Sequence, residues 1–265
     1  MSTQKPSLPR RAFRVARDHG VGSLLGHARR YATASVTAPL WQYRYGVSLA
    51  SGWEAAVSTE RPVFADLFAN LRPDDVFYDV GAYVGVFTRP VADVLSEGSV
   101  VAFEPGDGAN RLRAFVGDDP NVHVVEKAVS RRDGEGYHSH QDRVGLLGDS
   151  DAEAFASIDG REILDDGDLP LPNVVKIDVF GAEVDAVEAL APLLERDECR
   201  LVYCEVHLPT SFQQKRPDDV FEAYLDEWSF TDLVETFYRC GFEVEPTYLR
   251  RDTHDVFLRA AKDGA

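Results

Sequence analysis

The stretch that decides the fold is VFYDVGAYVGVF, residues 76–87. An apolar run typical of a short buried strand carries one acid, Asp79, and is followed by two glycines four positions apart, Gly81 and Gly85. A glycine directly after a strand lets the chain turn tightly, and a second one lets the following helix approach closely. We therefore interpret the stretch as a strand, a loop and a helix start at the carboxyl end of a parallel sheet.

Outward from this stretch, apolar strand segments alternate with helical segments. Strands are expected at residues 76–80, 99–105, 121–130, 173–179 and 200–207. Two final segments, GFEVEPTY and HDVFLRA, stand too close together for a crossover helix, so they should form an antiparallel pair. The pattern predicts an α/β fold: a Rossmann-like, doubly wound, seven-stranded sheet that is mostly parallel and has a C-terminal antiparallel hairpin.

The chain is expected to consist of an N-terminal arm, residues 1–59, and one domain, residues 60–265. Residues 1–45 hold eight Lys or Arg and one acid, and their apolar spacing is partly helical. Such an arm either docks on an acidic domain, contacts a membrane surface or partner, or stays disordered. Within the domain, residues 131–172 read as a polar insertion, in which EGYHSH and EAFASID are expected to pair as a hairpin.

Charge and cysteine content exclude several classes of protein. The formal net charge is −17, and residues 46–265 hold 20 bases against 44 acids, so a nucleic-acid partner is not expected. With 23 Arg, 5 Lys, 27 Asp and 18 Glu, the composition favours adaptation to a high-salt cytoplasm over a merely acidic protein of a GC-rich genome. Three cysteines show no metal-ligand spacing and should be reduced and buried. No apolar run approaches a membrane span, which predicts a cytoplasmic protein, peripheral to the membrane if the arm binds it.

A second acid suggests what the glycine loop binds. Glu104 ends the next predicted strand, nineteen residues after Gly85, where a carboxylate can accept hydrogen bonds from ribose hydroxyls. Asp79 can orient the loop or accept from an ammonium group, and the G-x-G-x-x-G turn of a nicotinamide site is missing. The pattern favours a nucleoside that carries an amino acid, S-adenosylmethionine, over a nicotinamide oxidoreductase. The alternative is that both glycines serve only strand-to-helix packing.

The chain also resembles a known family. VFYDVGAYVGVFT, VVAFEP, VHVVEKAVSRRDGEG, SIDGREIL, NVVKIDVFGAE and YCEVH are similar in order and spacing to segments of the FkbM-type methyltransferases, a class I S-adenosylmethionine-dependent family. The resemblance runs from about Asp75 to His207. It implies that residues 60–265 form a class I methyltransferase domain that methylates an oxygen of a sugar, glycan or small hydroxylated metabolite. Within these motifs we add further residues to the cofactor site: Ala82, Tyr83, Pro105 and Ala128.

Two residues depart from the family pattern. Tyr83 stands where the family usually has Asn, and Phe180 stands where it usually has Glu. The second change removes an acid near the expected active site. Two interpretations follow: the protein takes a different acceptor, or it is a degenerate member that binds a cofactor or glycan without catalysis.

Four residues are the candidates for catalysis: Asp178, Glu183, Glu205 and His207. Asp178 follows a strand and is placed to hold the cofactor's amino group, orient the acceptor or ligate a divalent cation. Alternatively, it caps the next expected helix, EVDAVEALAPLLER, which begins at Glu183. Glu183, in that helix's first turn, either serves the site or stabilises the helix dipole. Glu205 and His207 share one face of a strand, and His207 is the expected general base unless it is merely a solvent-exposed strand end. Metal dependence stays open.

Overall fold

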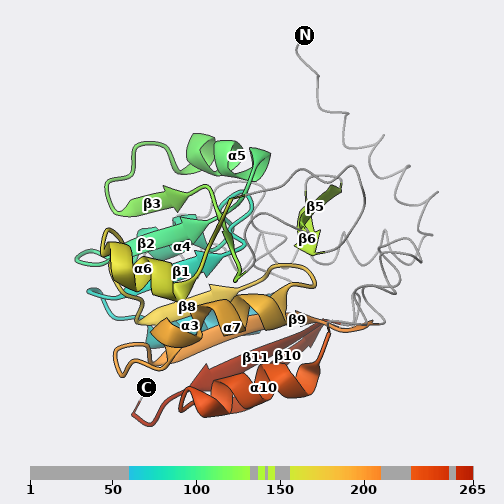
Figure 1. Cartoon of the computed structure of the whole chain (residues 1–265). Helices are drawn as coiled ribbons and strands as arrows, with labels where there is room; N and C mark the ends of the chain where they lie inside the picture. Colours follow the sequence, from blue (N-terminus) through green and yellow to red (C-terminus); the bar gives the residue numbers. More distant parts are fainter. Residues whose placement is uncertain are drawn as a thin grey trace, which may run out of the picture. The chain divides into compact units, whose positions relative to one another are not determined.

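The computed structural model describes residues 60–131, 137–140, 143–146, 156–209, 228–250 and 255–264. The predicted N-terminal arm lies outside the described residues. Residues Pro62–Ala265 belong to one compact unit, built around a sheet (Figure 1). Among the described helices, none is long and apolar enough to cross a membrane.

Seven strands form the central sheet in the order β10-β11-β9-β8-β1-β2-β3. Their bounds are β1 Val76–Val80, β2 Ser99–Phe103, β3 Val122–Val125, β8 Val174–Ile177, β9 Leu201–His207, β10 Glu243–Arg250 and β11 Asp255–Ala261. The neighbours from β9 to β3 pair in parallel, whereas β11 is antiparallel to both β9 and β10. This topology confirms the predicted fold class, with the last strand inserted between β9 and β10.

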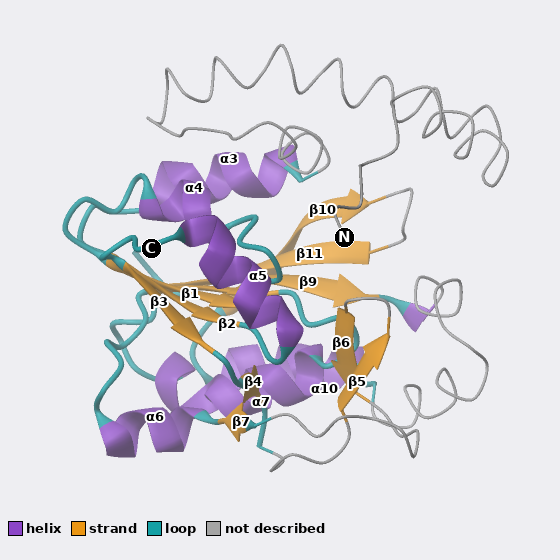
Figure 2. Cartoon of the chain, turned by 90° about the horizontal axis from the view of Figure 1, so that it is seen from above, coloured by secondary structure: helices purple, strands orange, loops and turns teal. Residues whose placement is uncertain are grey.

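Helices cover both faces of this sheet, as Figure 2 shows: α3, α4 and α5 lie on one side and α6, α7 and α10 on the other. Their bounds are α3 Arg61–Asn70, α4 Thr88–Ala92, α5 Asp107–Val116, α6 Gly160–Asp166, α7 Glu183–Leu194 and α10 Phe230–Arg239. The helix expected around the second glycine is thus reduced to the five residues of α4. Helix α10 begins after Ser229, whose hydroxyl caps it by accepting from the amide of Asp232 at 3.1 Å.

Alternating side chains of β1 divide between the two faces. Tyr78 and Val80 join a core cluster with Leu190 of α7 and Phe237 of α10. Phe77 and Asp79, which alternate with them along β1, therefore face the side of α3 and α4. The cysteines Cys199, Cys204 and Cys240 are free and buried, as expected.

The expected pairing within the insertion was wrong. β5, Tyr137–His140, pairs with β6, Arg143–Leu146, because two intervening residues make a local hairpin the nearest partner. β7, Ser157–Ile158, instead pairs in parallel with β4, Ala128–Val129. β7 then leads into α6, a helix that the sequence analysis missed although Asp159 caps it by accepting from two backbone amides.

Candidate functional site

The candidate site lies at the carboxyl ends of the strands, where β1 has β2 on one side and β8 on the other. In such a sheet this reversal of strand order is where ligands bind. Gly81 follows β1 with φ +74°, and its amide donates to the carbonyl of Phe103 at 3.0 Å. A Cβ at Gly81 would lie 2.0 Å from the backbone oxygen of Asp178. The loops after β1 and β8 therefore touch, and only glycine fits there.

Glu104, at the end of β2, is held against the loop that follows β1. Its side chain Oε2 accepts from the backbone amide of Tyr83 at 2.6 Å, and the residue is 6% exposed. Helix α5 passes close by, since a Cβ on Gly108 would lie 2.1 Å from Oε1. Burial raises the pKa of Glu104 to about 7, although the Tyr83 amide and the charge of Lys176 work against that rise. A ligand with hydroxyl donors would favour its ionised form.

Lys176 links the two sides of the site, and the sequence analysis missed it. It is the register partner of Asp79 across β1 and β8, and its side chain is 3% exposed. Its Nζ lies 3.3 Å from Asp79 Oδ1 and 3.3 Å from Asp178 Oδ2, and it donates to the carbonyl of Gly81 at 3.1 Å. A lysine inside the apolar segment NVVKIDV, two positions before an acid, was the available signal.

Asp79 is fully buried and meets groups of the protein itself. Oδ2 accepts from the hydroxyl of Thr88, the first residue of α4, at 2.6 Å. Oδ1 is within ion-pair distance of Lys176 but lacks hydrogen-bond geometry to any described group. Asp79 thus contacts both ends of the loop that follows β1: the start of α4 through Thr88, and Gly81 through Lys176. A contact between Asp79 and the ammonium group of a ligand stays a prediction.

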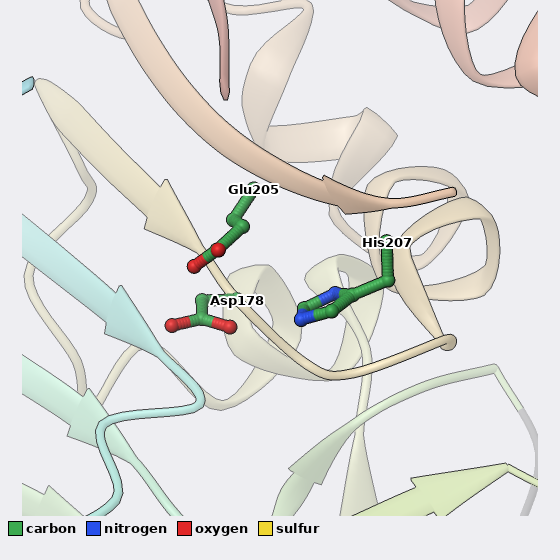
Figure 3. A group of neighbouring side chains, drawn as sticks. All are labelled: Asp178, Glu205 and His207. Carbon is green, nitrogen blue, oxygen red and sulfur yellow. The ribbon is translucent and has the colours of Figure 1, made fainter. Parts of the chain in front are cut away.

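Asp178, Glu205 and His207 converge because of the strand period. Lys176 of β8 pairs in register with Tyr203 of β9. Asp178 lies two positions after Lys176, and Glu205 and His207 lie two and four positions after Tyr203, so all three are on the same face. One ligand atom from each of the three lies within 4.8 Å of the other two, and Figure 3 shows their side chains pointing toward one another. Glu205 and His207 are 2% and 4% exposed, whereas the Asp178 side chain is 31% exposed.

His207 is fixed from behind by the fourth candidate. Its Nδ1 lies 2.6 Å from Glu183 Oε1, which also accepts from the amide of Gly181 at 2.8 Å. Burial works to lower the pKa of His207, but Glu183, Glu205 and Asp178 together raise it to about 9. The alternative of a solvent-exposed strand end was therefore wrong, and the base role of His207 stays a prediction.

The helix-cap alternative for Asp178 was also wrong. Helix α7 begins at Glu183 with Ala182 at the cap position and without a side-chain cap. Glu183 does lie in the first turn, and its carboxylate reaches back to Gly181 and across to His207. Glu183 therefore fits both alternatives, because it lies in the first turn of α7 and also contacts His207.

The two departures from the family pattern share an unusual backbone conformation. Tyr83 and Phe180 have φ of 53° and 47°, and they are the non-glycine residues with positive φ in the described part of the chain. Bulky residues adopt this region at a cost. Tyr83 is 40% exposed, whereas the buried ring of Phe180 packs edge-on against His207 with centroids 4.5 Å apart.

The remaining predicted cofactor residues divide into two groups. Ala82 and Pro105 are buried neighbours of Gly81 and Glu104, and Gly85 is close to α5, where its Cβ would meet Leu112 at 2.8 Å. Ala128 instead belongs to β4, and its amide donates to the carbonyl of Ala156 at 2.9 Å. A role for Ala128 in the cofactor site stays a prediction.

The chain is similar in sequence to a family of known proteins. The model of the Methyltransferase FkbM domain matches residues 79–244, a segment that contains every predicted site residue. The chain is 25% identical over 200 residues to the hexuronic acid methyltransferase AglP of Haloferax volcanii, covering 71% of this chain and 74% of that protein.

Two solved methyltransferase structures are also similar to the chain. A methyltransferase FkbM from Methylobacillus flagellatus KT has 13% identity and a TM-score of 0.43, covering 98% of this chain and 72% of that chain. The precorrin-6y C5,15-methyltransferase of Geobacter metallireducens GS-15 has 18% identity and a TM-score of 0.44, covering 82% of this chain and 94% of that chain.

Proposed function

The chain belongs to the FkbM family of methyltransferases, and on this premise we propose that it transfers the methyl group of S-adenosylmethionine to an oxygen atom of an acidic sugar. One observation supports this proposal most: carboxylates gather on both sides of the strand-order reversal. Glu104 directly follows β2 on one side; on the other side, Asp178 directly follows β8 and Glu205 lies two residues before the end of β9.

The β1–β2 side suits the nucleoside. Glu104 is positioned by the Tyr83 amide, and its raised pKa reflects a carboxylate that burial has removed from water. The ribose hydroxyls of S-adenosylmethionine supply such donors. The loop from Gly81 to Gly85 would lie against the amino-acid part of the cofactor, in keeping with the sequence analysis.

The β8–β9 side suits the acceptor. In the reaction, the bond between the sulfonium sulfur and the methyl carbon breaks while a bond from the acceptor oxygen to that carbon forms. The hydroxyl proton goes to Asp178, which is the most exposed of the three converging groups. S-adenosylhomocysteine is the second product. Alignment of the two reactants is the main contribution of the protein and supplies roughly 7–11 kcal/mol.

The acceptor is inferred from the relative whose name states a hexuronic acid. Phe180 replaces the usual acid of the family with an aromatic ring beside His207. An apolar edge next to hydrogen-bonding groups is a common arrangement for binding the ring of a sugar. We therefore place a hexuronic acid residue of a glycan or a small glycoside at this end of the crevice.

Calorimetric titration and a transfer assay test the proposal. S-adenosylmethionine and S-adenosylhomocysteine should bind, whereas NAD should not. Radiolabelled methyl groups should then pass to some member of a panel of hexuronides and neutral glycosides. The variant Asp197→Asn, with an exposed acid changed at the opposite end of β9, is the control for loss of charge. Cofactor binding without transfer to any glycoside would argue for a binding module, and binding of NAD alone would overturn the proposal.

We also propose that the protein is adapted to high salt. Its net charge of −17 creates self-repulsion that molar salt screens within roughly 3 Å. Thermal melts in graded KCl should show a melting temperature that rises from dilute buffer to molar salt. An unchanged melting temperature would contradict this adaptation.

A further inference from the structure

The three converging side chains have the separation of a metal site. One atom each of Asp178, Glu205 and His207 lies within 4.8 Å of the other two. Divalent cations bind carboxylate oxygen and imidazole nitrogen at about 2.0–2.3 Å, so two ligands of one ion lie up to about 4.5 Å apart. Small side-chain movements would therefore bring all three atoms into one coordination sphere.

The orientation of His207 provides independent support, because it is set from outside the trio. With Nδ1 at 2.6 Å from Glu183 Oε1, the Nδ1–H can donate to that carboxylate, and a cation bound in place of the Nε2 proton would keep this contact. Figure 3 shows one ring nitrogen of His207 turned toward Asp178. A histidine whose second nitrogen donates to a carboxylate is the usual arrangement at metal centres. Glu183 is itself anchored by the amide of Gly181 at 2.8 Å and is 1% exposed.

The charges at the site also call for a cation. The carboxylates of Asp178, Glu183 and Glu205 gather around one imidazole ring, and buried negative charge is costly unless positive charge is nearby. Lys176 shares its single charge between Asp79 and Asp178, at 3.3 Å from each. Glu183 Oε2 is buried without a hydrogen-bond partner among the described groups. A divalent ion would balance this excess of carboxylates at the end of β8 and β9.

We propose that Asp178, Glu205 and His207 bind one divalent cation, through two carboxylates and the Nε2 of the imidazole. The mixed oxygen and nitrogen set suits Mn²⁺ or a neighbouring first-row ion better than Ca²⁺, which prefers an all-oxygen cage. Three protein ligands leave coordination positions for oxygen atoms of a substrate. Resting on the proposed function, the ion would bridge the carboxylate or adjacent hydroxyls of an acidic sugar to an otherwise negative crevice.

Binding of Mn²⁺ alone tests the site without cofactor or acceptor. The full chain, stripped with a chelator and held in molar KCl, is titrated with Mn²⁺ while electron paramagnetic resonance counts the free ion. One site is expected, weakened at least tenfold in Glu205→Gln and Asp178→Asn. Glu235→Gln removes an exposed acid of α10 and should bind like the parent. No site in the parent, or equal weakening in the Glu235 variant, would overturn the proposal.

A spectroscopic readout on the unmutated protein avoids variants that fail to fold. Electron spin-echo modulation of the bound Mn²⁺ should show coupling to an imidazole nitrogen, and ¹⁵N-histidine labelling should shift that coupling. Bound Mn²⁺ without nitrogen coupling would overturn the assignment of His207. Because S-adenosylmethionine binding is titrated separately in chelator, failure of the metal site can be distinguished from failure of the proposed methyltransferase function.

Discussion

The two halves of the candidate site use buried carboxylates in different ways. On the β1–β2 side, Glu104 meets a backbone amide, and burial raises its pKa to about 7. On the β8–β9 side, Glu183 and Glu205 lie around a histidine whose pKa they raise to about 9. In one half a buried carboxylate meets a single backbone amide, and in the other several carboxylates gather around an imidazole. Hydroxyl groups of a ligand suit the first half, whereas positive charge suits the second.

Lys176 keeps these halves distinct although they touch. Its ammonium group lies between Asp79 and Asp178, so each acid partly meets its charge inside the protein. Contact between the halves is otherwise made by backbone, where Gly81 approaches the carbonyl of Asp178. Substitutions in one half should therefore alter cofactor affinity, and substitutions in the other should alter turnover.

The largest effect is expected from Asp178→Asn. The amide keeps the size of the side chain but can neither take the hydroxyl proton nor replace the carboxylate as a metal ligand, so turnover should fall ~10²–10⁴-fold. Affinity for S-adenosylmethionine, measured by calorimetry, should stay within a few-fold of the parent. The same assay on His207→Gln tests the base predicted from the sequence, and Asp197→Asn is the charge-matched control. If Asp178→Asn weakens cofactor binding as much as turnover, the two halves are not separate.

Glu104→Gln should produce the opposite result. A neutral amide replaces the charged acceptor of the ribose hydroxyls, and loss of a charge-assisted hydrogen bond costs about 1.5–3 kcal/mol. Calorimetry should show S-adenosylmethionine binding weakened roughly 10- to 150-fold. Glu97→Gln, an exposed acid before the amino end of the same strand, should bind normally. Undiminished affinity in Glu104→Gln would remove the ribose assignment.

The pH dependence of cofactor binding should report on Glu104. Its pKa of about 7 lies above the usual range, so the carboxylate of the free protein is protonated below that pH and ionised above it. Because the ionised form accepts better from hydroxyls, affinity should rise by up to about tenfold per pH unit from pH 5.5 to 7 and then level off. The amino group of the ligand also titrates, and Glu104→Gln controls for this. A pH profile that is the same in both proteins would contradict the shifted pKa.

Sequence reasoning reached the parts of this site that depend on strand period. Glu205 and His207 were placed on one face by their spacing, and Asp178 follows from the same rule on the next strand. It could not find the ion pair of Lys176 with Asp79, which depends on the register between β1 and β8, or the Glu183–His207 contact, which depends on how α7 packs beside β9. The pairing of β7 with β4 was missed for the same reason. Two-residue strands carry too little pattern to identify a partner.

The smallest effect is expected where the sequence departs from its family. Tyr83 is held at φ 53° with a ring that is 40% exposed, so it carries backbone strain without much burial in return. Asn tolerates this conformation better and keeps the amide that donates to Glu104, so Tyr83→Asn should raise stability by about 0.5–1 kcal/mol. Calorimetric melts should show an increase of about 1–4 °C. Phe180→Asn relieves the same kind of strain but loses a ring that is 7% exposed and packs on His207, so it should lower the melting temperature. If both variants move the melting temperature in the same direction, the difference in burial between Tyr83 and Phe180 does not decide whether an aromatic residue at positive φ stabilises the protein.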